Sequence, residues 1–364
     1  MARIKRVQAE VPACFAVVHP GLEPIAADEI TRDLGGVVKK AERGIVVFRV
    51  DAITPDLLEL RTVEDLYLFA WGTDSLTHRA MDLNQIRQWT VRDANWKDLF
   101  HFHHQVRPQG KRKPTYRLIT QKDGTHGYRR IDAQDAYAEG LRRKIPETWR
   151  LGDDDAWVEM WLIIRGPTAI AGVRLSDRTM RHRTYKVEHL KASLRPTVAA
   201  AMVRLAGAGP GDYVLDPMCG AATILAEQIE LSKLRRAGRI ETIGGDLDMN
   251  MLRAARSNLA KVGPAVLANW DARTLPLATD SVQRIICNMP FGKQVSTPEE
   301  IGPLYQRTVR ELDRVLQIGG RAVLLVSEME PLRAAIRKTE WKALRQLDVE
   351  VLGQDATISV WNKL

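Results

Sequence analysis

The sequence predicts an α/β protein whose C-terminal half forms a doubly wound, mostly parallel sheet, with smaller α+β units before it. From Ser193 onward, short apolar runs alternate with helical segments of about 10 to 15 residues, which is the pattern of a parallel sheet covered by helices on both faces. The part of the chain before Ser193 lacks this regular alternation and carries clusters of lysine and arginine instead. A length of 364 residues suits two or three domains of ordinary size.

The N-terminal half contains short segments with the spacing of strands and of helices, as expected of small α+β units. Gly35 and Gly36 end the first predicted helix, and an aspartate-rich turn occupies residues 151–155. Residues 175–192 form a polar, basic linker without clear periodicity. The predicted elements are strands at 14–18, 44–50, 115–120 and 156–164, helices at 22–34 and 133–144, and a helix leading into a strand over 57–70.

The C-terminal half begins with a helix in which Pro196 occupies the first turn, where its missing N–H is not needed, and Gly207 follows its end. Near the C-terminus, two strands surround a Gly-Gln-Asp turn and should add an antiparallel hairpin to the edge of the sheet. We therefore expect a Rossmann-like domain over residues 193–364. The predicted strands are 213–217, 242–246, 266–270, 284–288, 321–327, 341–353 and 356–362, and the predicted helices are 196–205, 223–233, 249–262 and 303–316.

A formal charge of +9 favours a polyanionic partner, because lysine and arginine side chains that neutralise phosphates release condensed counterions. His101, His103 and His104 have no carboxylate or cysteine at ligand spacing, so we expect them at the surface, in contact with nucleic acid at most. The basic candidates for contact with RNA are Arg107, Lys111, Arg112, Lys113, Arg129, Arg130, Arg181, Arg183 and Lys186.

Several classes of protein are disfavoured. No apolar run is long enough to span a bilayer, and the first residues lack the apolar stretch of a secretory signal, so we expect a soluble, cytoplasmic protein without membrane contact. Cys14, Cys219 and Cys287 lie far apart and match no zinc pattern. We therefore expect neither a disulfide nor a metal.

Polar residues stand at the ends of four predicted strands. Asp216 begins Asp-Pro-Met-Cys-Gly-Ala-Ala-Thr, Asp246 ends Thr-Ile-Gly-Gly-Asp, Asp271 lies in Asn-Trp-Asp-Ala, and Asn288 begins Asn-Met-Pro-Phe-Gly. Ligands of open α/β sheets bind beyond the carboxyl ends of the strands. Each aspartate alone could be a helix cap, but their recurrence at successive strand ends favours one shared ligand site. In that site Asp246 is placed to accept hydrogen bonds from ribose hydroxyls, and Asp271 suits an adenine amino group.

The ligand expected here is S-adenosylmethionine rather than a dinucleotide. A dinucleotide-binding dehydrogenase needs Gly-x-Gly-x-x-Gly after its first strand, whereas this turn has Gly220-Ala-Ala-Thr behind an Asp-Pro. A carboxylate at Asp216 serves a pyrophosphate poorly but suits the cationic amino group of a methionine moiety.

Asn-Met-Pro-Phe is expected to carry the chemistry. The exocyclic amino nitrogen of a nucleobase attacks a sulfonium methyl only if its hydrogens are held and its lone pair is directed at the methyl carbon. The side-chain oxygen of Asn288 can accept one N–H, and a carbonyl of Met289 or Pro290 the other. Pro290 stiffens this turn, and Phe291 offers a face on which an extruded base can stack. Catalysis then consists mostly of positioning, without a strong general base.

Residues 193–364 resemble a class I methyltransferase, and Asp-Pro-Met-Cys-Gly with Asn-Met-Pro-Phe-Gly-Lys resembles the THUMP-domain tRNA guanine-N2 methyltransferases. The stretch Leu-Ser-Asp-Arg-Thr-Met-Arg-His-Arg at 175–183, followed by His-Leu-Lys-Ala-Ser-Leu at 189–194, is similar to the segment that joins the THUMP region to the catalytic domain in that family and helps to close over the cofactor. More weakly, residues 12–70 resemble the N-terminal ferredoxin-like domain and about 75–172 the THUMP domain. We therefore expect a ferredoxin-like domain at 1–72, a THUMP RNA-binding domain at 73–174, the linker at 175–192 and the methyltransferase domain at 193–364.

The resemblance implies transfer of a methyl group from S-adenosylmethionine to N2 of a guanine in tRNA, at position six of the acceptor stem, with the THUMP region holding the 3′ CCA end of the tRNA and the protein acting as a monomer. The sequence departs from the family pattern at two places: Ala221-Ala222 replaces the common Ser-Gly, and Met289 stands where many amino-methyltransferases have proline. Carried over residue by residue, the resemblance places His189, Ala192, Ser193 and Leu194 beside the cofactor, Met218, Cys219 and Gly220 beneath it, Asp246 at the ribose, Asp271 and Ala272 at the adenine, and Asn288 at the target amino group.

Three alternatives stay open at this point. The same site could act on guanine at tRNA position ten or in ribosomal RNA. The protein could instead bind RNA with a decayed methyltransferase domain, which the intact Asp246, Asp271 and Asn288 disfavour. A DNA amino-methyltransferase would fit the Asn-x-Pro-Phe motif alone, but the basic N-terminal half disfavours it.

Overall fold

The computed structural model of the protein describes residues 10–110, 113–154, 156–188, 193–291, 298–351 and 353–364. These residues form two compact units. The first takes in residues up to Val17, Ala27–Leu60 and Asp65–Asp177, and the second Val18–Ala26, Arg61–Glu64 and Arg178–Leu364. In the described part of the chain, no helix is both long and apolar enough to cross a membrane.

The second unit is built on a seven-stranded sheet that contains β9 (Tyr213–Asp216), β10 (Glu241–Asp246), β11 (Val266–Asn269), β12 (Val282–Asn288), β13 (Leu316–Val326), β14 (Trp341–Val351) and β15 (Gln354–Lys363). The strand order is β11-β10-β9-β12-β13-β15-β14. Neighbouring strands from β11 to β13 run parallel, whereas β15 pairs antiparallel with both β13 and β14. The expected Rossmann-like sheet with an antiparallel hairpin at its edge is therefore confirmed.

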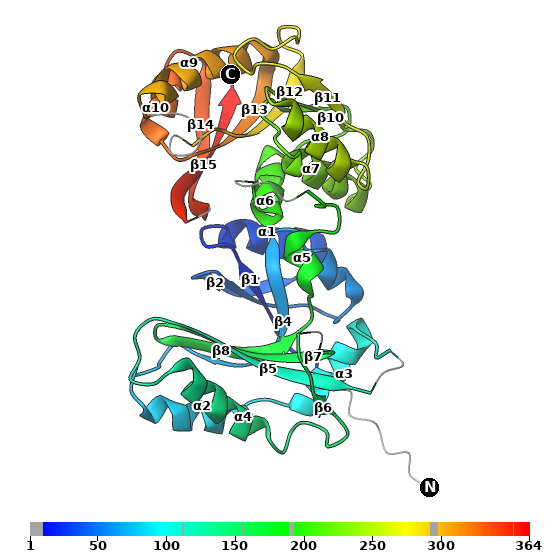
Figure 1. Ribbon diagram of the computed structural model, residues 1–364, viewed down its shortest axis with the longest axis vertical. Coiled ribbons are helices and arrows are strands. Elements are labelled where there is room, and N and C mark those ends of the chain that lie inside the picture. Colours follow the sequence, from blue (N-terminus) through cyan, green and yellow to red (C-terminus); the bar gives the residue numbers. More distant parts are fainter. Residues whose placement is uncertain (1–9, 111–112, 155, 189–192, 292–297, 352) are drawn as a thin grey trace. The chain divides into compact units, whose positions relative to one another are not determined.

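Helices cover both faces of this sheet (Figure 1). They are α6 (Pro196–Ala206), α7 (Thr223–Leu234), α8 (Met249–Leu259), α9 (Pro298–Val315) and α10 (Met329–Ile336), with the short α5 (Arg178–His182) before them. On β13, Val323 and Leu325 pack in the cluster that contains α6, whereas Ala322 and Leu324 pack in the cluster that contains α9 and α10. Because successive side chains of a strand point to opposite faces, β13 is buried on both sides.

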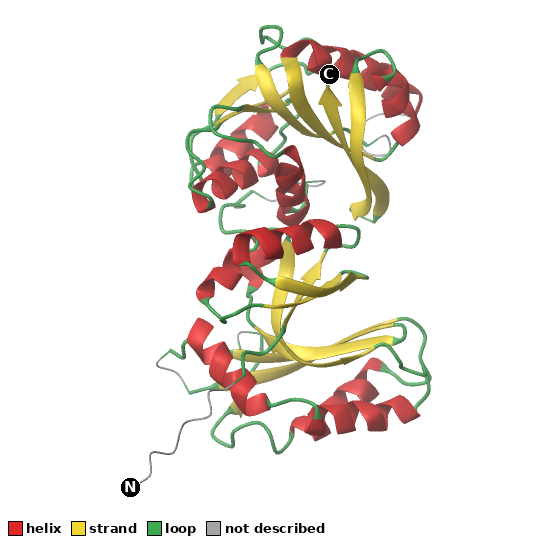
Figure 2. Cartoon of the chain, turned by 180° about the vertical axis from the view of Figure 1, so that it is seen from behind, coloured by secondary structure: helices red, strands yellow, loops and turns green. Residues whose placement is uncertain are grey.

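The first unit contains one sheet of eight strands, with helices packed beside it (Figure 2). The strand order is β2-β3-β1-β4-β8-β7-β5-β6. The last residue of β1 and the first residues of α1 and β4 are counted with the second unit. The elements of this part of the chain are β1 (Cys14–Val18), α1 (Glu23–Leu34), β2 (Val37–Glu42), β3 (Ile45–Arg49), the 3-10 helix η1 (Pro55–Glu59), β4 (Val63–Thr73), α2 (Met81–Arg92), α3 (Trp96–Val106), β5 (Thr115–Asp123), α4 (Arg130–Leu141), β6 (Arg150–Leu151), β7 (Val158–Arg165) and β8 (Thr168–Arg174).

The strand β4 runs across the domain boundary expected at residue 72. Its residues Tyr67 to Thr73 pair antiparallel with β8, so the regions expected to be separate ferredoxin-like and THUMP domains share one sheet. The helix expected from residue 57 is only the 3-10 turn of η1, after which β4 begins.

The surface position expected for His103 is wrong. This side chain is 1% exposed, because it lies on the same face of α3 as Leu99, Phe102 and Val106. Burial lowers the pKa of His103 to about 3, so the ring is neutral at physiological pH.

Candidate active site

A cavity of about 610 Å³ lies at the carboxyl ends of β9, β10, β11 and β12. This is the crevice in which open α/β sheets bind their ligands. The predicted site residues that line it are Ser193, Met218, Gly220, Asp246, Asp271, Ala272, Asn288, Pro290 and Phe291.

Three further predicted cofactor residues, Asp216, Leu194 and Cys219, are not among the described residues that line this cavity. Asp216 is 1% exposed, and Leu194 and Cys219 are also buried. His189 and Ala192 lie outside the residues that the structure describes.

The turn between β9 and α7 is tied to the end of β10. The backbone N–H of Gly220 donates to Oδ2 of Asp246 at 2.9 Å, and the N–H of Cys219 donates to the carbonyl of Gly245 at 2.9 Å. Oδ1 of Asp246 accepts the N–H of Asp248, also at 2.9 Å. These two backbone hydrogen bonds to its oxygens hold the side chain of Asp246 in place. Because a carboxylate oxygen can accept more than one hydrogen bond, Asp246 can still accept one from a ribose hydroxyl.

Glycine at the end of β10 allows Trp270 to pack against the sheet. A Cβ at Gly245 would lie 2.2 Å from Cε2 of the indole, which excludes any larger residue there. The indole Nε1 donates to the carbonyl of Pro217 at 3.0 Å and thereby fixes the ring in the cavity wall. Trp270 was not singled out from the sequence, although it directly precedes Asp271.

Asp271 is ionised and already has a partner. Nε of Arg273 lies 2.9 Å from each carboxylate oxygen, and hydrogen bonds from Arg273 lower the pKa of Asp271. Arg273 also lines the cavity, two residues beyond the predicted contact. A contact between Asp271 and an adenine amino group would therefore use the lone pairs that Arg273 leaves free.

Asn288 presents an unused acceptor. Its Oδ1 is buried and has no hydrogen-bond partner among the described residues. A buried polar atom without a partner is unfavourable unless a ligand supplies one, so this oxygen is suited to accept a ligand N–H. The following residues are fixed on both sides: the N–H of Met289 donates to the carbonyl of Leu325 at 2.9 Å, and Tyr305 donates to the carbonyl of Pro290 at 3.0 Å.

Phe291 contributes less surface than expected. Its side chain is 8% exposed and belongs to the apolar cluster beneath the sheet. Only a small part of the ring therefore reaches the cavity, and full stacking on a base would require the ring to move.

Asp216 lies behind the cavity wall formed by Pro217 and Met218. Its Oδ1 accepts the N–H of Met218 at 3.3 Å. Burial, with a smaller contribution from the charge of Asp246, raises the pKa of Asp216 to about 8. The carboxyl group of Asp216 is therefore not exposed at the cavity surface, where a cationic amino group could reach it. The contact between them stays a prediction.

Arg183 does not fit the phosphate contact expected of it. Its guanidinium is 7% exposed, and Nε lies 3.0 Å from Oε1 of the fully buried Glu227. The same carboxylate receives Tyr185 Oη at 2.7 Å and Arg61 Nε at 2.7 Å. Contact with RNA would require breaking this buried ion pair, so Arg183 instead holds the linker against α7.

The other basic candidates differ in exposure. Lys186 donates to the carbonyl of Leu194 at 2.8 Å, and burial lowers the pKa of Lys186. Arg107 is bound by the carbonyl of Leu175 and by Asp177, each at 3.0 Å. Arg181 is half-buried, whereas Lys113, Arg129 and Arg130 are exposed, and Lys111 and Arg112 lie outside the described residues.

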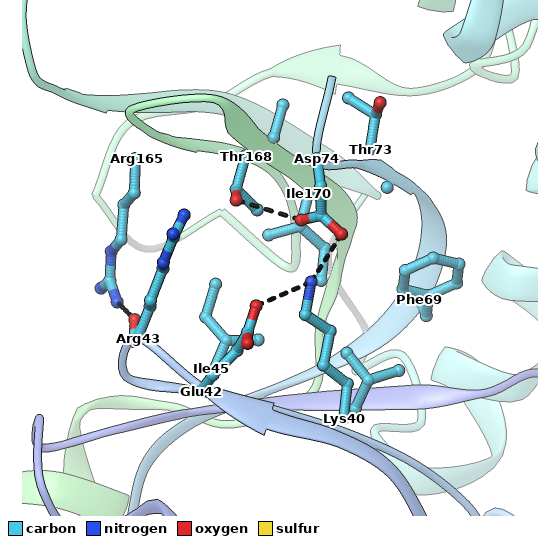
Figure 3. A pocket seen from close by; sticks show the side chains of 13 residues that line it. Lys40, Glu42, Arg43, Ile45, Phe69, Thr73, Asp74, Arg165, Thr168 and Ile170 are labelled. Carbon is cyan, nitrogen blue, oxygen red and sulfur yellow. Dashed lines mark hydrogen bonds and ion pairs between the residues drawn. The ribbon is translucent and has the colours of Figure 1, made fainter. Parts of the chain in front are cut away.

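A second cavity, of about 200 Å³, lies in the first unit above Ile45, Phe69 and Ile170 (Figure 3). Lys40 binds Asp74 at 2.6 Å and Glu42 at 3.0 Å along its rim. Among the described residues that line this cavity, no buried side-chain acceptor lacks a hydrogen-bond partner as Oδ1 of Asn288 does. The cavity beside Asn288 is therefore the better candidate for catalysis.

Known proteins resemble both the C-terminal domain and the whole chain. The family UPF0020, described as RMKL-like, methyltransferase domain, matches residues 183–355. The tRNA (guanine(6)-N2)-methyltransferase of Thermus thermophilus is 28% identical over 325 residues, which cover 88% of this chain and 91% of that protein. The crystal structure of TrmN from Thermus thermophilus has a TM-score of 0.77 at 26% identity and covers 97% of this chain and 99% of that one.

A further relative matches over a shorter stretch. The U6 snRNA (guanine-N(2))-methyltransferase THUMPD2 of Bos taurus is 38% identical over 140 residues, which cover 38% of this chain and only 26% of that protein. The similarity to the bacterial relative therefore extends over nearly the whole chain, whereas the similarity to the bovine protein covers a minor part of each.

Proposed function

Because the chain belongs to the family of THUMP-type, RMKL-like guanine-N2 methyltransferases, we propose that it methylates N2 of guanine 6 in tRNA with S-adenosylmethionine as donor. The observation that carries this function is the buried Oδ1 of Asn288, which has no hydrogen-bond partner within the part of the chain that the structure describes and lies in a cavity that also holds Asp246 and Asp271. That arrangement combines an acceptor for an amino group with carboxylates suited to an adenosine.

The cavity residues fit the cofactor. We assign Asp246 to the ribose hydroxyls and Asp271 with Ala272 to the adenine, because all three residues line the cavity. Gly220, which has no Cβ, has an open space where a side chain would stand, so the backbone turn can lie against a ligand. We keep His189, Ala192, Ser193 and Leu194 as proposed neighbours of the cofactor.

Asn288 orients the guanine amino group in the proposed mechanism. S-adenosylmethionine, when bound, supplies an electrophilic methyl group. Oδ1 of Asn288 accepts one hydrogen of N2, which turns the nitrogen lone pair toward the methyl carbon. With the cofactor bound, the N2–C bond would form as the sulfur–carbon bond breaks, S-adenosylhomocysteine would be the leaving group, and the methylated nitrogen would release its extra proton to water.

The second hydrogen of N2 requires another acceptor. The carbonyl of Pro290 already accepts from Tyr305, but a carbonyl oxygen has two lone pairs and can accept again. The Met289 and Pro290 carbonyls both stay candidates. Tyr305 then serves to fix the orientation of the Pro290 peptide.

The N-terminal part is proposed to hold the tRNA. Residues 1–72 and 73–174 would act as ferredoxin-like and THUMP domains that bind the acceptor stem and the 3′ CCA end, and the protein would act as a monomer. The exposed cations Lys113, Arg129 and Arg130 are the proposed phosphate contacts within this part.

Methylation of tRNA transcripts tests the proposal. Wild-type protein with S-adenosylmethionine should form N2-methylguanosine in a transcript with guanine at position 6, and mass-spectrometric mapping should locate the methyl group there. A matched transcript with adenine at position 6, and its pairing partner changed to match, should not be methylated. Modification of guanine 10, of ribosomal RNA or of U6 snRNA instead would keep the chemistry and refute the target, whereas absence of cofactor binding would refute the activity.

A further inference from the structure

Asn258 is fully buried in the last turn of α8 and bridges two segments that are distant in the sequence. Its Oδ1 accepts the backbone N–H of Val187 at 3.0 Å and that of Glu188 at 3.1 Å. Its Nδ2 donates to the carbonyl of Ala221 at 3.0 Å. One side-chain amide thus holds both the linker and the turn that forms the cavity wall.

The turn held by Asn258 contains an unfavourable backbone conformation. Ala222, the N-cap residue directly before α7, has φ 60° and ψ 31°, in the left-handed region that residues with a Cβ rarely adopt. The Ala221 carbonyl belongs to the peptide that directly precedes Ala222. The hydrogen bond from Asn258 therefore fixes the peptide whose orientation sets the φ angle of Ala222.

The linker held by Asn258 is fixed at neighbouring positions too. Tyr185 donates to Glu227 of α7, and Lys186 donates to the carbonyl of Leu194, next to the cavity residue Ser193. Val187 and Glu188 are the last described residues before 189–192. The backbone amides bound by Asn258 thus lie in the described part of the linker, five and six residues before the cavity residue Ser193.

We propose that Asn258 is a positioning residue that couples the linker to the cofactor turn and thereby sets cofactor affinity. The inference rests on the proposed function, because it assumes that the cavity binds S-adenosylmethionine. Asn258 does not line the cavity, so it acts only through the backbone that it holds.

Two substitutions test the arm of this bridge that holds Ala221. Asn258→Asp keeps an acceptor for Val187 and Glu188 but removes the donor to Ala221 and turns an oxygen toward that carbonyl. Ala222→Gly removes the backbone strain without touching Asn258. If Asn258 acts by holding the strained turn, glycine at 222 should compensate for its loss.

Calorimetric titration with S-adenosylhomocysteine measures the effect. Asn258→Asp should raise Kd about tenfold over wild type, since the turn would lose its backbone hydrogen bond. Adding Ala222→Gly to this variant should return Kd to within about threefold of wild type, whereas Ala222→Gly alone should change Kd by less than about twofold. Ser257→Asp introduces the same charge at the adjacent exposed position and should leave Kd unchanged.

Steady-state kinetics supply a second readout. Asn258→Asp should raise KM for S-adenosylmethionine while kcat changes by less than about threefold, because Asn288 and the RNA contacts stay in place. Circular dichroism verifies that each variant is folded. If Asn258→Asp does not fold, Asn258→Ser takes its place in the same comparison with Ala222→Gly.

Each outcome separates this inference from the proposed function. If Asn258→Asp binds S-adenosylhomocysteine with the wild-type Kd, the role of Asn258 is overturned and the enzyme assignment stands. The same holds if Ala222→Gly changes Kd by the same factor in the wild-type protein and in the Asn258→Asp variant. Failure of the wild-type protein to bind S-adenosylhomocysteine overturns the cofactor assignment itself.

Discussion

The hydroxyl of Tyr305 lies 3.0 Å from the carbonyl oxygen of Pro290 and donates a hydrogen bond to it. Tyr305 belongs to α9 and is fully buried, and Pro290 follows Asn288 by two residues. This bond therefore fixes the loop that we propose presents the target base to the methyl donor. Burial keeps the pKa of Tyr305 above its ordinary value, so the hydroxyl retains its proton and stays a donor at physiological pH.

Tyr305→Phe should reduce kcat about fivefold, because one net hydrogen bond that orients the Pro290 peptide is lost. The Kd for S-adenosylhomocysteine should change little, since the phenyl ring preserves the packing of α9. Single-turnover methylation and calorimetry measure the two quantities. A larger loss of cofactor affinity than of kcat would show that Tyr305 supports the cofactor side of the cavity instead.

Asn288→Ala should reduce the methylation rate by about 10²- to 10³-fold, comparable to removal of a preorganised polar group from other active sites. Cofactor affinity should stay within about threefold, because Asp246 and the turn at Gly220 are unchanged. Single-turnover rates with saturating tRNA test the first expectation and calorimetry the second. A variant that methylates at the wild-type rate would exclude Asn288 from catalysis.

The sequence was sufficient to predict the parallel sheet and the residues at its strand ends. Asp246, Asp271 and Asn288 meet in one cavity because parallel strands bring their carboxyl ends to the same edge. This inference needs only the order of the elements and the position of each residue at the end of its strand.

Contacts from distant segments could not be predicted. Tyr305 follows Pro290 by 15 residues and lies on the helix α9, and Asn258 holds Ala221 across 37 residues. The sequence also predicts an exposed side chain for Arg183, and this prediction is wrong. A cluster of basic residues in the sequence does not reveal that Glu227 lies beside Arg183 in the fold. The helices α2 and α3 and the strand β2 were not predicted at all.

Glu227→Gln should lower the free energy of unfolding by about 3 to 5 kcal/mol, because two buried guanidinium groups, of Arg61 and Arg183, would lose their carboxylate. Chemical denaturation monitored by circular dichroism measures this loss. Glu230→Gln, one turn further along α7, is the matched control. Oε2 of Glu230 lies 3.7 Å from Nη1 of Arg61, and the Glu230 side chain is partly exposed. Its substitution should therefore change the free energy of unfolding by less than about 1 kcal/mol. Equal effects of both substitutions would contradict the buried network.

The raised pKa of Asp216 predicts that the stability of the protein depends on pH. Its pKa is raised from 3.8 to about 8 by burial, so between these values the folded protein binds more protons at this site than the unfolded chain. The stability contributed by the site is therefore fully present below pH 4 and is lost as the pH rises toward 8. The loss is at most ~1.4 kcal/mol per pH unit.

Asp216→Asn removes this titration while keeping the size of the side chain. The Tm of the wild-type protein should fall relative to that of the variant as the pH rises from 5 to 8, which differential scanning fluorimetry can follow. Parallel curves for the two proteins would mean that Asp216 is already ionised at pH 5. In that case the variant should also lose affinity for S-adenosylhomocysteine, as expected of a carboxylate that binds the amino group of the cofactor.

The exposed cations of the first unit should determine how tRNA binding depends on salt. Lys113→Ala and Arg130→Ala should each weaken binding to all tRNA sequences and reduce the slope of log K against log salt by about 1, because each phosphate contact releases about one counterion. Arg337→Ala removes the same charge from an exposed position in the second unit and should leave the slope unchanged. Filter binding between low and physiological salt measures all three slopes. If Arg337→Ala altered the slope as much as the other two, the charge effect would be general, and Lys113 and Arg130 would not be direct contacts.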